Sequence, residues 1–399
     1  MSFIVVVVIA VAALAAQEPK ADAISAGQVR SAIDRLGDLD FSSRMKAAQT
    51  VRRAPPAVAS PALIDAVSSH ADGYVRFKAL VLLAGFNDPR ATSLMLAALK
   101  DPNDRLRATA YAYFEDHPSP EALGVMLPAF EREASEFVRP ALTRALAAAS
   151  MTSVASGFSR TGLDNVQNVM RQAVTRGQDF FRSIAIEALG DHKATYALPE
   201  IAKVATAGGP LQDDAAVAIG KIGDKKGLET LAAIQRTAPR NVQPTIAAGI
   251  CLLGVNCGSH VGYLIETLRF SVKEVGYQEL LRSAASGLAA VAVAGNTDAL
   301  TALFDAGIPS RDPARAPIAL AVGTVAIRNP ALMLRWLASR ADRADLAEAS
   351  ALLAEAFDML EEHYEEERFF VTVRRAYWQA AEGSASRRVA ATLIGKLEF

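Results

Sequence analysis

The stretch that decides the fold runs from Asp72 to Ala110 and reads D-G-Y-V-R-F-K-A-L-V-L-L-A-G-F-N-D-P-R-A-T-S-L-M-L-A-A-L-K-D-P-N-D-R-L-R-A-T-A. It opens with an aspartate four positions before Arg76 and continues into an apolar, helix-forming run. A short N-D-P turn and a second apolar run follow, and the opening then returns at Asp104 and Arg107. The stretch therefore predicts a pair of antiparallel helices and the start of the next pair.

The arginine of this opening recurs at a nearly fixed interval. It stands at Arg44, Arg76, Arg107 and Arg139, at steps of 32, 31 and 32 residues (76−44, 107−76, 139−107). The next match is Arg182, a step of 43 (182−139), and the surplus lies in a small, polar segment at 150–160 that we interpret as a longer loop or joint. A fixed period of this length predicts an all-α fold, a right-handed α-solenoid of about nine or ten antiparallel helix pairs.

Composition agrees with a helical chain and excludes a general electrostatic role. Half of the 399 residues are apolar but only 7% are aromatic, and small or straight-chain apolar residues suit closely packed helices. The 42 basic residues against 43 acidic ones leave a net charge of −1, which provides no overall attraction to nucleic acid or to anionic membranes. We therefore expect neither nucleic acid nor a membrane as the partner.

The first residues predict export. An apolar run of 14 residues, Phe3 to Ala16, is too short to span a membrane, for which about 20 residues are needed. Polar residues follow it, and Ala13-Leu14-Ala15 fits a signal-peptidase site with cleavage after Ala15 or Ala16. We expect a secretory signal peptide at 1–16, a solenoid at 17–399 and a place in a bacterial periplasm, the envelope or the secreted space, without membrane insertion after cleavage. An uncleaved anchor is the alternative.

The repeated motifs resemble a known family. The segment E-A-L-G-D-H-K-A at Glu187 to Ala194 is matched 33 residues later by G-K-I-G-D-K-K-G at Gly220 to Gly227, and we expect the glycine before the aspartate to end the helix in each. With the acid-x-x-Val-Arg opening, this L-G-D-type turn and the period of 31–33 residues resemble HEAT repeats, especially the short HEAT-like type of phycobilisome lyases. The resemblance implies a scaffold, an adaptor, a lyase-type enzyme or, less in keeping with export, a nucleic-acid-binding protein. No catalytic residue of the family finds a matching position.

The arginine row has two interpretations. Aligned on successive second helices, these residues would form a ladder for the carboxylates or phosphates of a partner. Alternatively, the acidic residues three or four positions earlier cap each helix and pair with the arginines, which makes the row structural. The structural interpretation is the one we favour. The residues concerned are Arg76, Arg107, Arg139 and Arg182 in the row, with Asp72, Asp104, Glu136 and Asp179 as the expected caps.

Three aromatic residues stand at the start of predicted second helices: Phe137, Phe180 and Phe181. In HEAT-like units these helices generally line the concave side, so we consider the three residues candidates for partner contact, with core packing as the alternative.

The cysteines predict a disulfide rather than a metal site. Cys251 and Cys257 are the only two, which is too few for a structural zinc site, and their spacing is not C-x-x-C. In an oxidising compartment a disulfide between them would pin a helix-end loop, although so short a loop gains little stability. Two free thiols are the alternative.

No catalytic constellation is evident. His363 and Glu367 lie one helical turn apart in the acidic run Glu361 to Arg368, a spacing that can bind a divalent metal, but we interpret the run as a solvated face. We interpret residues 345–399 as a polar cap of the solenoid. We therefore predict no metal, no cofactor and no enzymatic activity, but a scaffold or adaptor whose concave face recognises a protein or peptide. A lyase- or transferase-type enzyme is the first alternative, and a nucleic-acid-binding protein is the second.

Overall fold

The computed structural model describes residues 24–274, 276–360, 363–397 and 399. These residues form 22 α-helices, three short 3-10 helices (η1, Arg35–Gly37; η2, Val154–Ser156; η3, Thr195–Ala197) and no strand. The predicted signal peptide at 1–16 lies outside the described residues. The first eighteen α-helices form nine consecutive packed pairs, in agreement with the repeat period, whereas α19 (Pro330–Ala338) packs on the helix before it and on the last helix of the chain more than on α20 (Leu346–Leu360).

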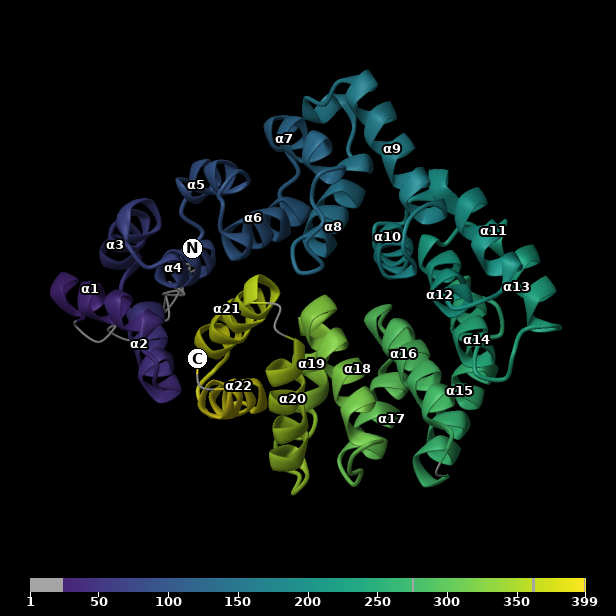
Figure 1. Ribbon diagram of the computed structural model, residues 1–399. Helices are drawn as coiled ribbons and strands as arrows, with labels where there is room; N and C mark the ends of the chain where they lie inside the picture. Colours follow the sequence, from purple (N-terminus) through teal and green to yellow (C-terminus); the bar gives the residue numbers. More distant parts are fainter. Residues whose placement is uncertain (1–23, 275, 361–362, 398) are drawn as a thin grey trace, which may run out of the picture.

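The pairs stack so that one helix of each faces outward and the other inward (Figure 1). The outer helices are α1 (Ala26–Asp34), α3 (Pro56–Ser69), α5 (Ala91–Ala98), α7 (Pro120–Phe130), α9 (Arg160–Thr175), α11 (Leu198–Ala207), α13 (Gly227–Gln235), α15 (Cys257–Lys273), α17 (Thr297–Gly307) and α19 (Pro330–Ala338). The inner helices are α2 (Phe41–Arg53), α4 (Gly73–Gly85), α6 (Asp104–Asp116), α8 (Arg139–Ser150), α10 (Asp179–Asp191), α12 (Gln212–Ile222), α14 (Gln243–Leu252), α16 (Gln278–Val293), α18 (Arg315–Arg328) and α20 (Leu346–Leu360). Two further helices, α21 (His363–Gln379) and α22 (Ala385–Lys396), follow α20.

The acidic residues of the repeat openings cap fewer helices than we expected. Asp72 is an N-cap and accepts a hydrogen bond from the backbone N–H of Tyr74. At the next repeat the cap is Asn103, so Asp104 is the first helical residue. Likewise α8 and α10 begin after residues 138 and 178, so neither Glu136 nor Asp179 is a cap. Asp104 and Asp179 instead lie in the first turn, where a negative charge is favourable, and each pairs with the arginine three residues later.

The prediction for the two L-G-D-type turns is confirmed at one and wrong at the other. Gly223 is the C-cap of α12 and has the left-handed φ of 79° that favours glycine. Gly190 lies inside α10 instead, and Lys193 takes the positive φ of that turn. A Cβ at Gly190 would lie 2.9 Å from the Cα of Ala218, so this glycine allows α10 and α12 to approach closely. The same sequence motif therefore serves chain reversal in one repeat and helix packing in the other.

The core lies between the two rows of helices. Alanine and leucine dominate it, and the inner helices bury alanine on several sides because each packs against an inner helix before and after it. The longer segment at 150–160 connects α8 to α9. Phe158 is buried there, and the Ser150 hydroxyl accepts a hydrogen bond from the Tyr196 hydroxyl, so this connection packs on the neighbouring repeat.

The two ends of the solenoid lie against each other. Figure 1 shows the helices arranged in a ring, with α21 beside α4 and α6 at the other end of the chain. The acidic run on α21 contributes to this closure, because Glu365 and Glu367 are buried. Our interpretation of the run as a solvated face was therefore wrong: its carboxylates meet arginines of the N-terminal repeats, including Arg52. Closure converts the concave face into the inside of a ring.

Candidate binding site inside the ring

The repeated arginines bond to the backbone of their own repeats. In four of them Nη1 donates to the carbonyl six residues earlier, in the turn that leads into the helix. Each guanidinium thereby satisfies carbonyls that the preceding helix and turn leave without partners. The pairs are Arg44 with Asp38, Arg76 with His70, Arg107 with Asp101, and Arg139 with Glu133; Arg182 bonds through Nε to the carbonyl of Val174. These contacts favour the structural interpretation of the row.

The three candidate aromatic residues lie in different surroundings. Phe137 and Phe180 are 51% and 48% exposed, so neither is a core residue. Phe181 is half-buried, and the guanidinium of Arg139 lies 5.0 Å from its ring centroid. Phe137 borders a cavity that also touches α21, as described below. The structure thus brings Phe181 to Arg139 but does not gather the three aromatic residues into one surface.

Cys251 and Cys257 form a disulfide. Cys251 is buried near the end of α14, and Cys257 is the first residue of α15. The bond therefore joins the end of an inner helix to the start of the next outer helix.

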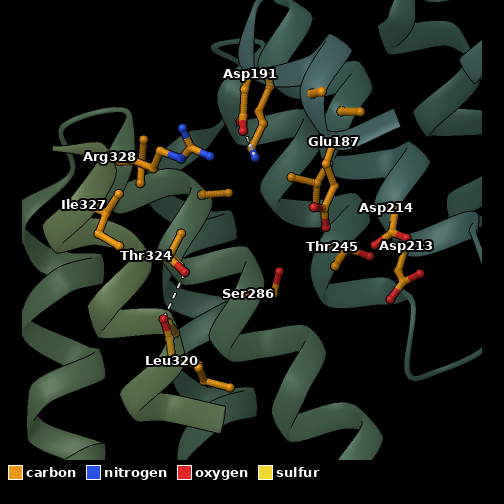
Figure 2. Close-up of a pocket in the computed structure, with 18 of the residues that line it drawn as sticks. Glu187, Asp191, Asp213, Asp214, Thr245, Ser286, Leu320, Thr324, Ile327 and Arg328 are labelled. Carbon is orange, nitrogen blue, oxygen red and sulfur yellow. Dashed lines mark hydrogen bonds and ion pairs between the residues drawn. The ribbon is translucent and has the colours of Figure 1, made fainter. Parts of the chain in front are cut away.

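A cavity of about 420 Å³ occupies the inside of the ring. Its lining comes from seven consecutive inner helices, α8 to α20. Figure 2 shows an acidic side formed by Glu187, Asp213 and Asp214 of α10 and α12. The opposite side is formed by α18, where the apolar Leu320 and Ile327 lie with Thr324 and Arg328. Arg144, Lys221 and Arg282 also line the cavity, and Lys221 and Arg328 are paired with Asp191 and Glu115. The cavity thus presents acidic groups to one side of a ligand and a mixed apolar and basic surface to the other.

The electrostatics of the acidic side favour a cation. Enclosure in the ring desolvates Glu187 and, with the negative charge of Asp214, raises the pKa of Glu187 to about 7. The carboxylate of Glu187 is still exposed to the open cavity, and solvent there limits the rise of its pKa. Burial likewise raises the pKa of Asp214 to about 6, although the hydroxyl of Ser183 donates to it over 2.6 Å. A positive group placed between these two carboxylates would stabilise their charged forms.

One feature of the sequence indicates this site, although the repeat period alone, followed through the arginines, does not reveal it. Side chains one repeat apart lie next to each other on neighbouring inner helices: Ser183 bonds to Asp214 and Asp191 pairs with Lys221, at separations of 31 and 30 residues. Applying the repeat period to polar residues, and not only to arginines, would have grouped Ser183 with Asp214, whereas Glu187 lies 27 positions before Asp214 (214−187) and does not follow the period. The opposite wall had no such indication, because it depends on the curvature of the ring.

The described residues contain no group of three or more His, Cys, Asp or Glu side chains placed to hold a metal ion. His363 and Glu367 do not form such a site, since Glu367 is paired with Arg52 and Arg374. Among the same residues, no single helix is long and apolar enough to cross a membrane. Only α18 and α19 taken together meet both criteria, and a bend of 110° separates these two helices.

Comparison with known proteins finds HEAT repeats in part of the chain. A family profile described as HEAT repeats matches residues 60–147. No curated protein matches the sequence. Among solved structures, the complex of CpcE and CpcF of phycocyanin lyase from Nostoc sp. has a TM-score of 0.38 at 17% identity, covering 69% of this chain and 97% of that one.

Two further solved structures are similar to this chain. An engineered protein has a TM-score of 0.29 at 17% identity, with 93% of this chain and 99% of that chain covered. The karyopherin Kap121p bound to Pho4p has a TM-score of 0.42 at 14% identity, covering 93% of this chain and 46% of that chain. The HEAT-repeat match thus covers residues 60–147, and the stacked helices on both sides of it continue the same all-α solenoid architecture.

Proposed function

We propose that this protein is a non-catalytic scaffold that binds an extended segment of a partner protein inside the ring. The observation that carries the proposal is the cavity of about 420 Å³ lined by α8 to α20. Pockets of roughly 300–1,000 Å³ enclose ligands the size of a few amino-acid side chains. A folded domain does not fit a space of this size, whereas a short extended segment does.

The chemistry of the walls specifies the segment. Glu187, Asp213 and Asp214 favour a lysine or arginine side chain, and Leu320 and Ile327 favour small apolar neighbours on its other side. The segment we propose therefore carries one basic residue flanked by apolar residues.

A lyase- or transferase-type enzyme is the second candidate. It is favoured by Glu187, whose pKa of about 7 suits a general acid or base and which shares the cavity with Asp214 and Thr245. No hydrogen bond connects Glu187 to a hydroxyl, thiol or imidazole among the described residues, so a nucleophile paired with a base is missing. Binding is the function that the geometry supports better.

We further propose that the protein is exported. The apolar run from Phe3 to Ala16 supports this, as does a disulfide between the only two cysteines, since disulfides persist in oxidising compartments. The intact mass of the mature protein tests the proposal: loss of residues 1–15 or 1–16 supports it, and a mass that includes Met1 contradicts it.

A site-specific photo-crosslinker tests the binding function. In one variant, benzoylphenylalanine replaces Ser286, which lines the cavity. In the matched control, it replaces Glu229, an exposed residue of the outer helix α13. We expect the Ser286 position to crosslink one recurrent partner segment that contains a lysine or arginine, and the Glu229 position to crosslink none. Equal crosslinking at both positions, or none at Ser286, would contradict the proposal.

A charge-removing variant separates binding from catalysis. Glu187→Gln with Asp214→Asn removes contacts to charged groups of about 1.5–3 kcal/mol each, so the captured segment should bind more than about ten-fold more weakly. If the partner segment is instead recovered chemically changed, and only with the unmodified acids, the enzyme candidate is correct.

A further inference from the structure

The helix α21 occupies a groove on the concave face of the N-terminal repeats. Glu367 accepts two hydrogen bonds from the Arg52 guanidinium of α2, at 2.9 and 2.7 Å, and a third from Arg374 at 3.1 Å. The ring of Phe370 lies 5.3 Å from the same Arg52 guanidinium. Arg52 is therefore held between a glutamate and an aromatic ring that stand three positions apart on one face of α21.

The fit around this contact is close. A Cβ at Gly85 of α4 would lie 2.9 Å from Oε1 of Glu367 and 3.3 Å from Cγ2 of Val371. At the start of α21, the His363 ring meets Phe77 of α4 edge-on at 5.3 Å. The groove thus recognises a helix by a buried arginine, an aromatic contact and a glycine that permits close approach.

The contact nevertheless leaves several buried polar atoms without hydrogen bonds. Among the described residues, such atoms include Nη1 of Arg52, Oε1 of Glu366 and Nη1 of Arg374, all at the contact with α21. A buried atom of this kind destabilises the contact, because it has left water without gaining a hydrogen-bond partner. Desolvation of the paired charges offsets much of their attraction, so a buried ion pair specifies geometry more than it adds net stability.

The packing beside α21 is incomplete as well. A cavity of about 500 Å³ lies between α21 and the turn after α4. Tyr113 and His117, at the end of α6, also line this cavity. A second cavity, of about 250 Å³, lies between α21 and the start of α8 and is bordered by the exposed Phe137. The neighbouring inner helices instead meet through fully buried apolar side chains such as Leu142 and Leu146. The contact of α21 is thus close around Glu367 and Gly85 but has a cavity on either side.

We propose that the concave face of α2, α4 and α6 is a helix-docking site that α21 fills within the chain and that a partner protein's helix fills in its place. The partner helix is amphipathic and presents a glutamate followed three positions later by an aromatic residue, the pattern of Glu367 and Phe370. The site is separate from the cavity lined by α8 to α20. The docking proposal can therefore be tested independently of the function proposed above.

The test uses the full chain and a fluorescein-labelled peptide with the sequence of His363–Gln379, with binding followed by fluorescence anisotropy. In the chain, Glu367→Gln weakens the internal contact and leaves the groove residues unchanged. Because apparent affinity scales with the fraction of open sites, we expect this variant to bind the peptide at least about ten-fold more tightly than the unmodified chain. A peptide that itself carries Glu367→Gln should lose that gain.

Two further variants make the test decisive. Arg343→Ala removes an exposed ion pair away from the groove, with Asp345, and should leave peptide affinity unchanged. Arg368→Ala removes the pair between α21 and Asp116 with little risk to folding, since its side chain is 51% exposed, and should also increase affinity. It replaces Glu367→Gln if circular dichroism shows that the latter does not fold. Equal affinities for the unmodified and the weakened chain, or no preference for the peptide with Glu367, would overturn the proposal.

Discussion

Arg52 and Glu367 are 315 positions apart in the chain and are joined by two hydrogen bonds between one guanidinium and one carboxylate oxygen. Their side chains are only 8% and 2% exposed. A solenoid whose repeats contact only their neighbours would never bring these residues together. This pair therefore couples the two ends of the solenoid, and the stability of the first repeats depends on the last helices.

Loss of Arg52 should open the ring. Arg52→Ala leaves Glu367 buried with Arg374 as its remaining ion-pair partner, and breaking a buried pair in this way costs about 3–5 kcal/mol. We expect a lower free energy of unfolding in urea and a larger maximum dimension in X-ray scattering. Arg35→Ala, at an exposed pair with Asp38, is the control and should change stability by less than about 1 kcal/mol. Identical scattering curves for both variants would contradict closure through Arg52.

Acid should weaken the ring through Glu115. This buried carboxylate of α6 contacts Arg144, His192 and Arg328, at 3.3, 3.2 and 3.3 Å, and so links α8, the end of α10 and the end of α18. Burial alone would raise the pKa of Glu115, but the hydrogen bond with His192 and the charges of Arg328 and Arg144 outweigh it and lower the pKa to about 2.

The sign of the pH effect follows from that shift. A carboxylate whose folded-state pKa is lowered stabilises the fold above its ordinary pKa of 4.5, and the contribution disappears as the pH falls toward 2. A lowering of the pKa of this size corresponds to about 3 kcal/mol of stability. Urea unfolding of the unmodified protein should show this loss between pH 5 and pH 2, on top of other groups, and Glu115→Gln should reduce the slope. Parallel pH profiles for the two proteins would show that Glu115 is not the group responsible.

Arg107 should contribute to stability and not to partner binding. Its guanidinium bonds to the carbonyls of Asp101 and Pro102 and pairs with Asp104 and Glu133. Arg107→Ala leaves these groups without their partner, and we expect a loss of about 1–3 kcal/mol. Crosslinking from Ser286 in the cavity should persist in the folded variant. A variant of unchanged stability that loses the partner would instead support the arginine ladder as a binding surface.

The repeat architecture was predictable because it is local, whereas the closure of the ring was not. Asp72 and Arg76 mark a helix start within five residues, and the same pattern one period later predicts the next pair. Nothing near Glu367 indicates that Arg52 lies beside it, so an acidic run on a C-terminal helix resembled a solvent-facing surface. The acidic side of the cavity was partly predictable, since the Ser183–Asp214 contact follows the period. The opposite wall depends on the summed curvature of all repeats, which no single motif encodes.

Glycine substitutions should separate close helix packing from helix propensity. A Cβ at Gly220 of α12 would lie 2.5 Å from the Cα of Gly249 in α14, where backbone atoms cannot move aside. Gly220→Ala should therefore destabilise the protein by about 1–3 kcal/mol, as overpacking does. A Cβ at Gly124, inside the outer helix α7, would meet no atom within 4 Å, so Gly124→Ala should stabilise by about 0.5–1 kcal/mol through helix propensity alone. Melting curves of the two variants that shift in the same direction would mean that α12 and α14 do not approach this closely in solution.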